Sequence, residues 1–113
     1  MNSKEIYEKL IQLEFHQKLL LKIISGSTQP FYRLIIEKSM TEKEVDEFFK
    51  LCDELNRMMV EQKEEGFVYF HPLFEILKTS LHPNLDIQEV IYACLLQQLY
   101  VPLMTELNKC LTN

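Results

Sequence analysis

The chain has 113 residues, of which 47% are hydrophobic and 26% charged, a composition typical of a folded globular chain rather than a disordered one. Only two glycines and four prolines occur, which disfavours the turn-rich all-β class and favours helices with few connections. The net charge of −5 arises in residues 37–65, which hold ten acidic and five basic residues, so no basic stripe is left for nucleic acid or a membrane surface. At this length we predict a single helical domain over residues 1–113.

Residues 3–24 are predicted to form the first helix, with Ser3 as its N-cap. Apolar residues spaced three or four apart mark one face: Ile6, Leu10, Leu13, Leu20 and Ile24. The last turns are apolar nearly all round, which is typical of a helix buried by its own chain or by a second copy. His16 and Gln17 interrupt the apolar face. A polar residue in such a seam either sets the register and number of partners or is a satisfied core residue.

A short second helix is predicted from Pro30 to about Lys38, because proline suits the first helical position. The segment before it, SGSTQP, breaks the first helix, and we expect Gly26 to take a positive φ there.

Thr41 and Glu44 match the capping box that begins a helix, so a third helix is predicted over residues 42–65 and ended by Gly66. One face carries an apolar stripe: Val45, Phe48, Cys52, Leu55 and Met59. The other faces carry the acidic excess. This segment is the clearest amphipathic helix of the chain.

The stretch HPLFEILKTSLHP holds a His-Pro dipeptide at each end. Two imidazoles eleven residues apart are roughly 16 Å apart along a helix axis, too far to share one metal ion. We therefore interpret His71 as the N-cap of a helix with Pro72 as its first residue, and His82-Pro83 as its end. A contact of His71 with Glu75 would suit acid–base chemistry, although the spacing does not require it.

Asp86 and Glu89 form a second capping pattern, which predicts a helix over residues 87–100. Pro102 kinks or ends that helix, and residues 103–111 complete one or two turns. Inside this apolar run, Gln97 and Gln98 are unusual, because a buried amide without partners costs about 1–3 kcal/mol. At least one of them should face a polar gap, the backbone of another helix or a subunit interface. The predicted architecture is a compact five- or six-helix bundle, with the first, third and fifth helices as long members.

Three cysteines lie far apart and form no metal or redox motif: Cys52, Cys94 and Cys110. We interpret them as small apolar residues of a protein in a reducing compartment. The N-terminus lacks the apolar core of a signal peptide, and no apolar run reaches the roughly 18 residues of a membrane span. These features predict a cytoplasmic protein.

The residues favour a non-enzymatic module that binds protein, itself included, with no catalytic, cofactor or metal residue assigned and no cofactor expected. Two alternatives stay open. One is a small-ligand or metal-dependent helical enzyme that uses His16, His71 or Glu75 together with residues of other helices. The other is a regulatory adaptor that docks a basic partner through the acidic face of residues 42–65. Whether His16, Gln17, Gln97 and Gln98 converge in space separates these hypotheses.

Four segments bear on a known family: EFHQKLLLKII, PFYRLIIEKSMTEKEVDEF, QKEEGFVYFHPLFEIL and ACLLQQLYVPLM. In this order and spacing they resemble the YhaI-like family of small uncharacterised bacterial proteins. The resemblance extends over nearly the whole chain and implies a compact multi-helical fold. It implies no activity and no catalytic residue at any position of this sequence.

Overall fold

The structure, a computed structural model, describes residues 1–24 and 29–111. The described residues form six helices and no strand, which confirms the all-α prediction. In chain order the helices are α1 (Ser3–Ile23), α2 (Pro30–Glu37), α3 (Glu42–Glu65), α4 (Phe70–Ser80), α5 (Ile87–Leu96) and α6 (Val101–Cys110). The positive φ predicted for Gly26 lies outside the described residues.

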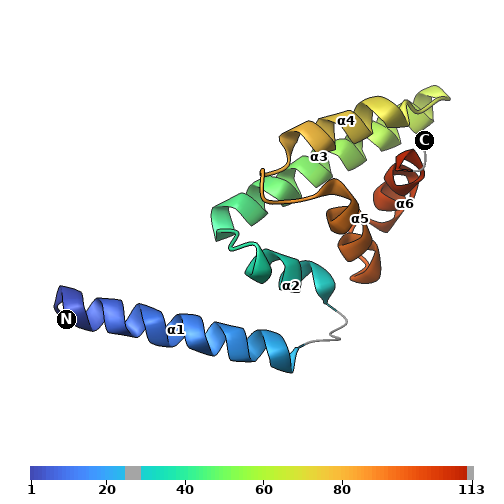
Figure 1. The fold of residues 1–113 in the computed structure, drawn as a ribbon. Coiled ribbons are helices and arrows are strands. Elements are labelled where there is room, and N and C mark those ends of the chain that lie inside the picture. The colour runs from blue at the N-terminus through green and yellow to red at the C-terminus, as the bar shows by residue number, and fades with distance from the viewer. Residues whose placement is uncertain (25–28, 112–113) are drawn as a thin grey trace.

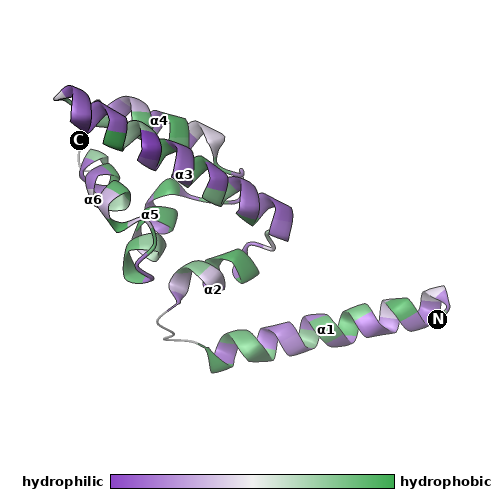
Figure 2. Cartoon of the chain, turned by 180° about the vertical axis from the view of Figure 1, so that it is seen from behind, coloured by the Kyte–Doolittle hydropathy of each residue, from purple (hydrophilic) through white to green (hydrophobic). Residues whose placement is uncertain are grey.

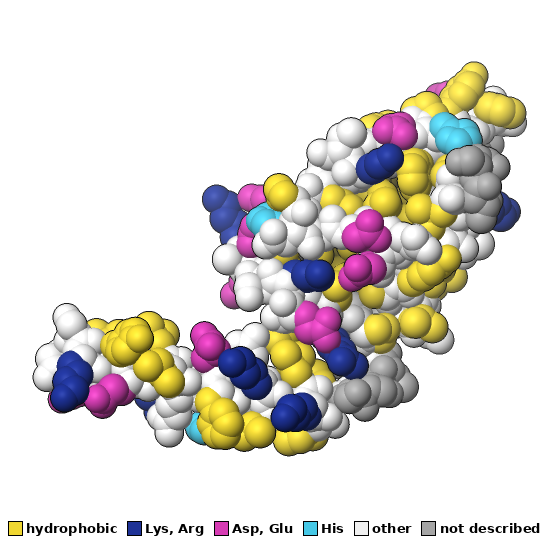
Figure 3. All heavy atoms as spheres, viewed as in Figure 1, with side chains coloured by type: hydrophobic (Ala, Val, Ile, Leu, Met, Phe, Trp, Pro, Cys, Tyr) yellow, Lys and Arg dark blue, Asp and Glu magenta, His cyan; other side chains and the backbone are white. Residues whose placement is uncertain are grey.

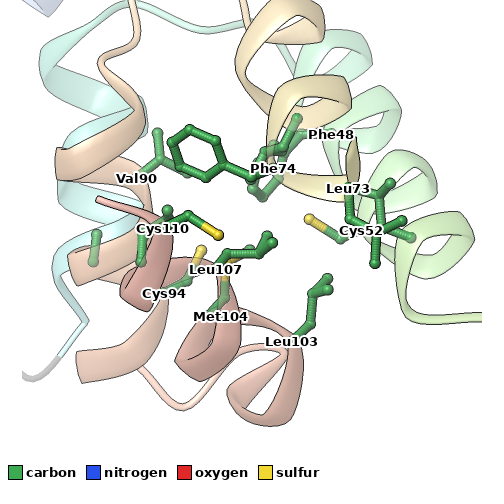
Figure 4. Packing of buried hydrophobic residues seen from close by; sticks show 14 of the residues in the cluster. Phe48, Cys52, Leu73, Phe74, Val90, Cys94, Leu103, Met104, Leu107 and Cys110 are labelled. Carbon is green, nitrogen blue, oxygen red and sulfur yellow. The ribbon is translucent and has the colours of Figure 1, made fainter. Parts of the chain in front are cut away.

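Helices α2 to α6 pack into a bundle around one apolar core. Helix α3 runs beside α4, α5 lies between α2 and α6, and α6 also contacts α3 and α4 (Figure 1). All five helices supply buried side chains: Phe31, Leu34, Phe48, Cys52, Leu55, Met59, Leu73, Phe74, Leu77, Val90, Ile91, Ala93, Cys94, Leu103, Met104, Leu107 and Cys110. Figure 4 shows part of this cluster, with side chains of α3, α4, α5 and α6 packed together. The bundle is therefore held mainly by burial of apolar surface.

Helix α1 lies outside this bundle. None of its 21 residues is buried, and its first half extends away from the other helices (Figure 1). The radius of gyration is 17.5 Å, whereas a compact chain of this length has about 13 Å. The compact shape predicted for the whole chain is thus limited to α2–α6. The chain buries neither face of α1, although its last turns are as apolar as predicted.

Local signals placed most helix ends correctly. The Thr41 side chain accepts from the Glu44 backbone N–H, and the Glu44 side chain accepts from that of Thr41, so the predicted capping box begins α3. Gly66 ends α3 with φ 104°, a left-handed conformation that glycine adopts without strain. At α1 the predicted cap is wrong by one residue, because Asn2 rather than Ser3 accepts from the Glu5 N–H, at 2.8 Å. Asparagine and serine are equally good N-caps.

Helix α4 begins earlier and ends earlier than predicted. Its N-cap is Tyr69, so His71 and Pro72 lie in the first turn, where the N–H groups have no partner within the helix and a proline removes no hydrogen bond. The helix ends at Ser80, and His82-Pro83 follows in the loop. The two His-Pro dipeptides therefore do lie near the two ends of α4, as predicted. The prediction that His71 is the N-cap was wrong.

Helix α5 was predicted to run to residue 100 and to be a long member of the bundle, but it ends at Leu96 after 10 residues. Gln98 and Tyr100 then take left-handed conformations, with φ of 62° and 51°, and the chain reverses into α6. Tyr100 is held there by its hydroxyl, which contacts Asp53 Oδ1 at 2.6 Å and the Phe49 carbonyl at 3.2 Å. Pro102 lies in the first turn of α6 rather than ending α5.

We expect Thr41→Ala to lower the free energy of unfolding by about 0.5–2 kcal/mol, since the Glu44 amide at the start of α3 loses its acceptor. Urea denaturation followed by circular dichroism measures this change. Thr105→Ala is the matched control, because Thr105 is exposed within α6. The capping role is contradicted if the two variants are equally stable.

Candidate functional site

The exposed apolar surface of α1 is the most unusual feature of the described chain. Nine large apolar side chains of this helix are between 40% and 75% exposed: Ile6, Tyr7, Leu10, Ile11, Leu13, Phe15, Leu19, Leu20 and Ile23. Figures 2 and 3 show apolar groups alternating with charged ones along the whole helix. Contiguous apolar surface larger than a few hundred Å² marks an interaction site in soluble proteins.

The seam of α1 consists of residues spaced alternately three and four apart, five of them apolar and two polar, and it ends at the C-cap: Ser3, Ile6, Leu10, Leu13, Gln17, Leu20 and Ile24. Its second half lies beside α2. Gln17, Leu20, Leu21 and Ile24 face Ile35, Ile36, Ser39 and Met40 across a groove of about 460 Å³. Gln17 Nε2 donates to the Ile36 carbonyl at 3.2 Å. The first half, residues 3–16, continues beyond the end of α2 (Figure 1), and we call it the free half of the seam.

Gln97 caps α2 from the opposite side. Its Oε1 accepts from the backbone N–H of Phe31 at 2.9 Å and from that of Tyr32 at 3.2 Å. These amides belong to the first turn of α2, whose own N-cap, Gln29, provides no side-chain cap. The prediction that one glutamine of the pair faces the backbone of another helix is confirmed for Gln97. Its neighbour Gln98 is exposed.

The polar residues that interrupt the apolar patterns do not converge on one pocket. Gln17 contacts the C-terminal part of α2 and Gln97 its N-terminal turn. His16 is exposed on α1, and its ring lies 6.0 Å from that of Phe15, measured between ring centroids. Among the described residues these four side chains therefore do not meet at one place.

His71 and Glu75 are both exposed on α4. The histidine that acquires a carboxylate partner is His82, whose Nε2 lies 2.8 Å from Glu44 Oε2. The Asn84 backbone N–H donates to its Nδ1 at 3.1 Å, an arrangement that leaves the Nε2 hydrogen for Glu44. The pair lines a groove of about 440 Å³ together with apolar side chains such as Phe48 and Leu81. Sequence spacing gave no signal for this pair, because its two members belong to different elements.

The pKa of Glu44 lies below its ordinary value, chiefly because the Thr41 backbone N–H and then the Thr41 side chain hydrogen-bond to its carboxylate, with a smaller effect from His82. A lowered pKa in the folded state means that the charged form favours folding. This contribution is present above the ordinary pKa of glutamate and is lost as the pH falls through the lower, folded value. The effect therefore belongs chiefly to the capping box at the start of α3.

The model of a protein family described as a protein of unknown function, DUF1878, matches residues 3–112. The chain belongs to this family. The match begins with the first residue of α1 and includes α6, so the exposed helix is part of the DUF1878 unit rather than an appendage to it.

The acidic face of α3 in this DUF1878 chain is partly neutralised by its own arginine. Arg57 pairs with Glu54 and with Glu61, the latter at 2.7 Å, and all three side chains are more than half exposed. Exposed pairs of this kind contribute at most about 1 kcal/mol. The docking of a basic partner on residues 42–65 stays a prediction.

The three cysteines of the DUF1878 chain are buried free thiols in the core (Figure 4). Burial raises the pKa of Cys94 to about 12 and also raises the pKa values of Cys52 and Cys110. Because the thiolate is the reactive form, such thiols act as small apolar residues, as predicted.

Within residues 1–24 and 29–111, no group of three His, Cys, Asp or Glu side chains is arranged to hold a metal ion. Over the same residues, no helix has the length and apolar character needed to span a membrane.

Proposed function

We propose that this DUF1878 protein is a non-enzymatic interaction module of the bacterial cytoplasm that associates with itself through α1. The observation that carries the proposal is that α1 contributes nothing to the core while exposing nine large apolar side chains. Most helical stability in proteins comes from packing of an apolar face against a partner. A helix with this composition is therefore expected to be covered in the working form of the protein.

The alternatives have less support. His16 lies on α1, outside the bundle that carries His71 and Glu75, so an enzyme that combined His16 with either of them would first need to bring two separate parts of the molecule together. The YhaI-like resemblance and a bacterial origin remain part of the proposal, since the matched family is described only as one of unknown function. Nucleic acid is not an expected partner, because the net charge is −5.

Leu10→Asp tests the proposal. Leu10 is 59% exposed at the middle of the free half, and a seam contact would bury it in both copies. Burying a leucine is worth about 1.5–3 kcal/mol, so losing two of them raises the dissociation constant by at least about 100-fold. Light scattering across a wide concentration range should give a mass above that of the monomer for the wild type and the monomer mass for Leu10→Asp.

The matched control is Gln12→Asp, which adds the same charge to the polar face of α1, where Lys9 Nζ donates to Gln12 Oε1 at 3.3 Å. We expect Gln12→Asp to associate like the wild type. A wild-type protein that stays monomeric at all concentrations contradicts the proposal. A Gln12→Asp variant that dissociates as fully as Leu10→Asp contradicts it as well.

A further inference from the structure

We infer that the free half of the α1 seam is covered by the free half of α1 from a second copy, and that the two helices run antiparallel. This inference rests on the proposed function and adds to it the partner, the direction and the register. Three observations support it: the spacing of the seam residues, the position of α2 beside the second half of the seam, and the apolar area of the free half.

The spacing of the seam is that of a coiled coil. Its residues alternate three and four apart over the whole helix, so they occupy the two core positions of a heptad repeat. Two helices with this pattern can pair along their length. The second half of the seam lies beside α2 of the same chain, across the groove lined by Gln17 and Leu20. The free half has the same seam but lies beyond the end of α2 (Figure 1).

The position of α2 selects the direction of pairing. In a parallel pair, the second copy of α1 would follow the seam past Gln17 into the space that α2 occupies. In an antiparallel pair, the second half of each α1 extends beyond the N-terminus of the other copy. The two α2–α6 bundles then lie at opposite ends of the helix pair. The free half has 14 residues, about 21 Å of helix, so both bundles fit without contact at the seam.

The area fits a weak, transient interface. Four apolar residues of the free half lie at the two core positions or at the position flanking them: Ile6, Tyr7, Leu10 and Leu13. At roughly 60–120 Å² each they bury roughly 240–480 Å² per copy, and the total lies in the range of weak encounters. Lys9 and Glu14 stay at the rim, where exposed charges contribute little. The dimer is therefore reversible and concentration-dependent.

The register follows from the core positions. Antiparallel heptads place the two kinds of core position opposite one another. Of the registers that this allows, we take the one that keeps both copies clear of Gln17 and α2, in which Ile6 of one copy faces Leu10 of the other and Ser3 faces Leu13. In this register the two copies of Ser3 are about 15 Å apart along the axis, beyond the reach of a disulfide. A parallel pair would place them directly opposite each other.

Cysteine cross-linking under mild oxidation tests direction and register together. The double variant S3C/L13C should form a covalent dimer, and S3C alone should not. The native thiols do not compete, because all three are buried. Cross-linking of S3C alone overturns the antiparallel arrangement. Light scattering of the wild type distinguishes failure of the antiparallel register from failure of self-association. A wild type that associates while S3C/L13C fails to cross-link refutes this inference alone. A monomeric wild type refutes the proposed function as well.

A second measurement leaves the seam intact, in case Leu13→Cys weakens association. A spin label on Lys22→Cys, at an exposed position in the last turn of α1, reports the distance between the two copies. The antiparallel register separates the two labels by about 42 Å along the axis, whereas a parallel pair brings them within about 25 Å. A distance distribution centred near 40 Å supports the inference, and one centred below 25 Å overturns it.

Discussion

Leu103→Ala is expected to lower the free energy of unfolding by about 2–5 kcal/mol, a large part of the stability of a small domain. Leu103 is fully buried on α6, the helix that contacts α3, α4 and α5. The loss combines the apolar burial of the side chain with the cavity left behind, which the surrounding core fills only in part. Chemical denaturation at low protein concentration measures the change without a contribution from association.

Leu96→Ala is the matched control, since Leu96 at the end of α5 is 72% exposed. We expect its effect to stay within about 0.5 kcal/mol. Equal losses at the two positions would contradict the placement of the core between α2 and α6.

Gln97→Leu is expected to lower the free energy of unfolding by about 1–3 kcal/mol, because two backbone amides at the start of α2 lose their acceptor together. The substitution keeps most of the side-chain volume, so the loss reports the hydrogen bonds rather than a cavity. Gln97→Glu keeps an acceptor at a helix N-terminus, where a negative charge is favourable, and should retain most of the wild-type stability at neutral pH.

The control for this site is Gln98→Asn. Gln98 is exposed with φ 62°, and asparagine tolerates the left-handed conformation, so the expected change is below about 0.5 kcal/mol. The capping role of Gln97 is wrong if Gln97→Leu and Gln97→Glu lose stability equally. Thermal or urea unfolding followed by circular dichroism distinguishes these outcomes.

Sequence reasoning worked where the signal is local. Thr41, Glu44 and Gly66 specify the ends of α3 through hydrogen bonds and a backbone conformation that involve only neighbours in the chain. The end of α5 was missed because no glycine marks it. Its left-handed turn uses Gln98 and Tyr100, and Tyr100 is held by contacts with α3 that only the folded bundle provides.

The candidate site was predictable only in part. The spacing of Ile6, Leu10 and Leu13 predicted an apolar face on the first helix, but periodicity does not say which surface covers that face. The side-chain partners of Gln17 and Gln97 and the pairing of His82 with Glu44 depend on how separate helices meet. Such contacts follow from tertiary packing, which a single sequence does not encode at any fixed spacing.

The cap that Gln97 provides also bears on the order in which the chain folds. Gln97 lies 66 residues after Phe31, so the start of α2 depends on a side chain that the ribosome adds much later. Contacts of such long sequence separation form late, since the loop between them must first be closed. During synthesis the first turn of α2 therefore gains this cap only after residue 97 has been added, when the apolar α1 is already made. The nascent chain thus exposes the apolar side chains of α1 before its bundle can be completed.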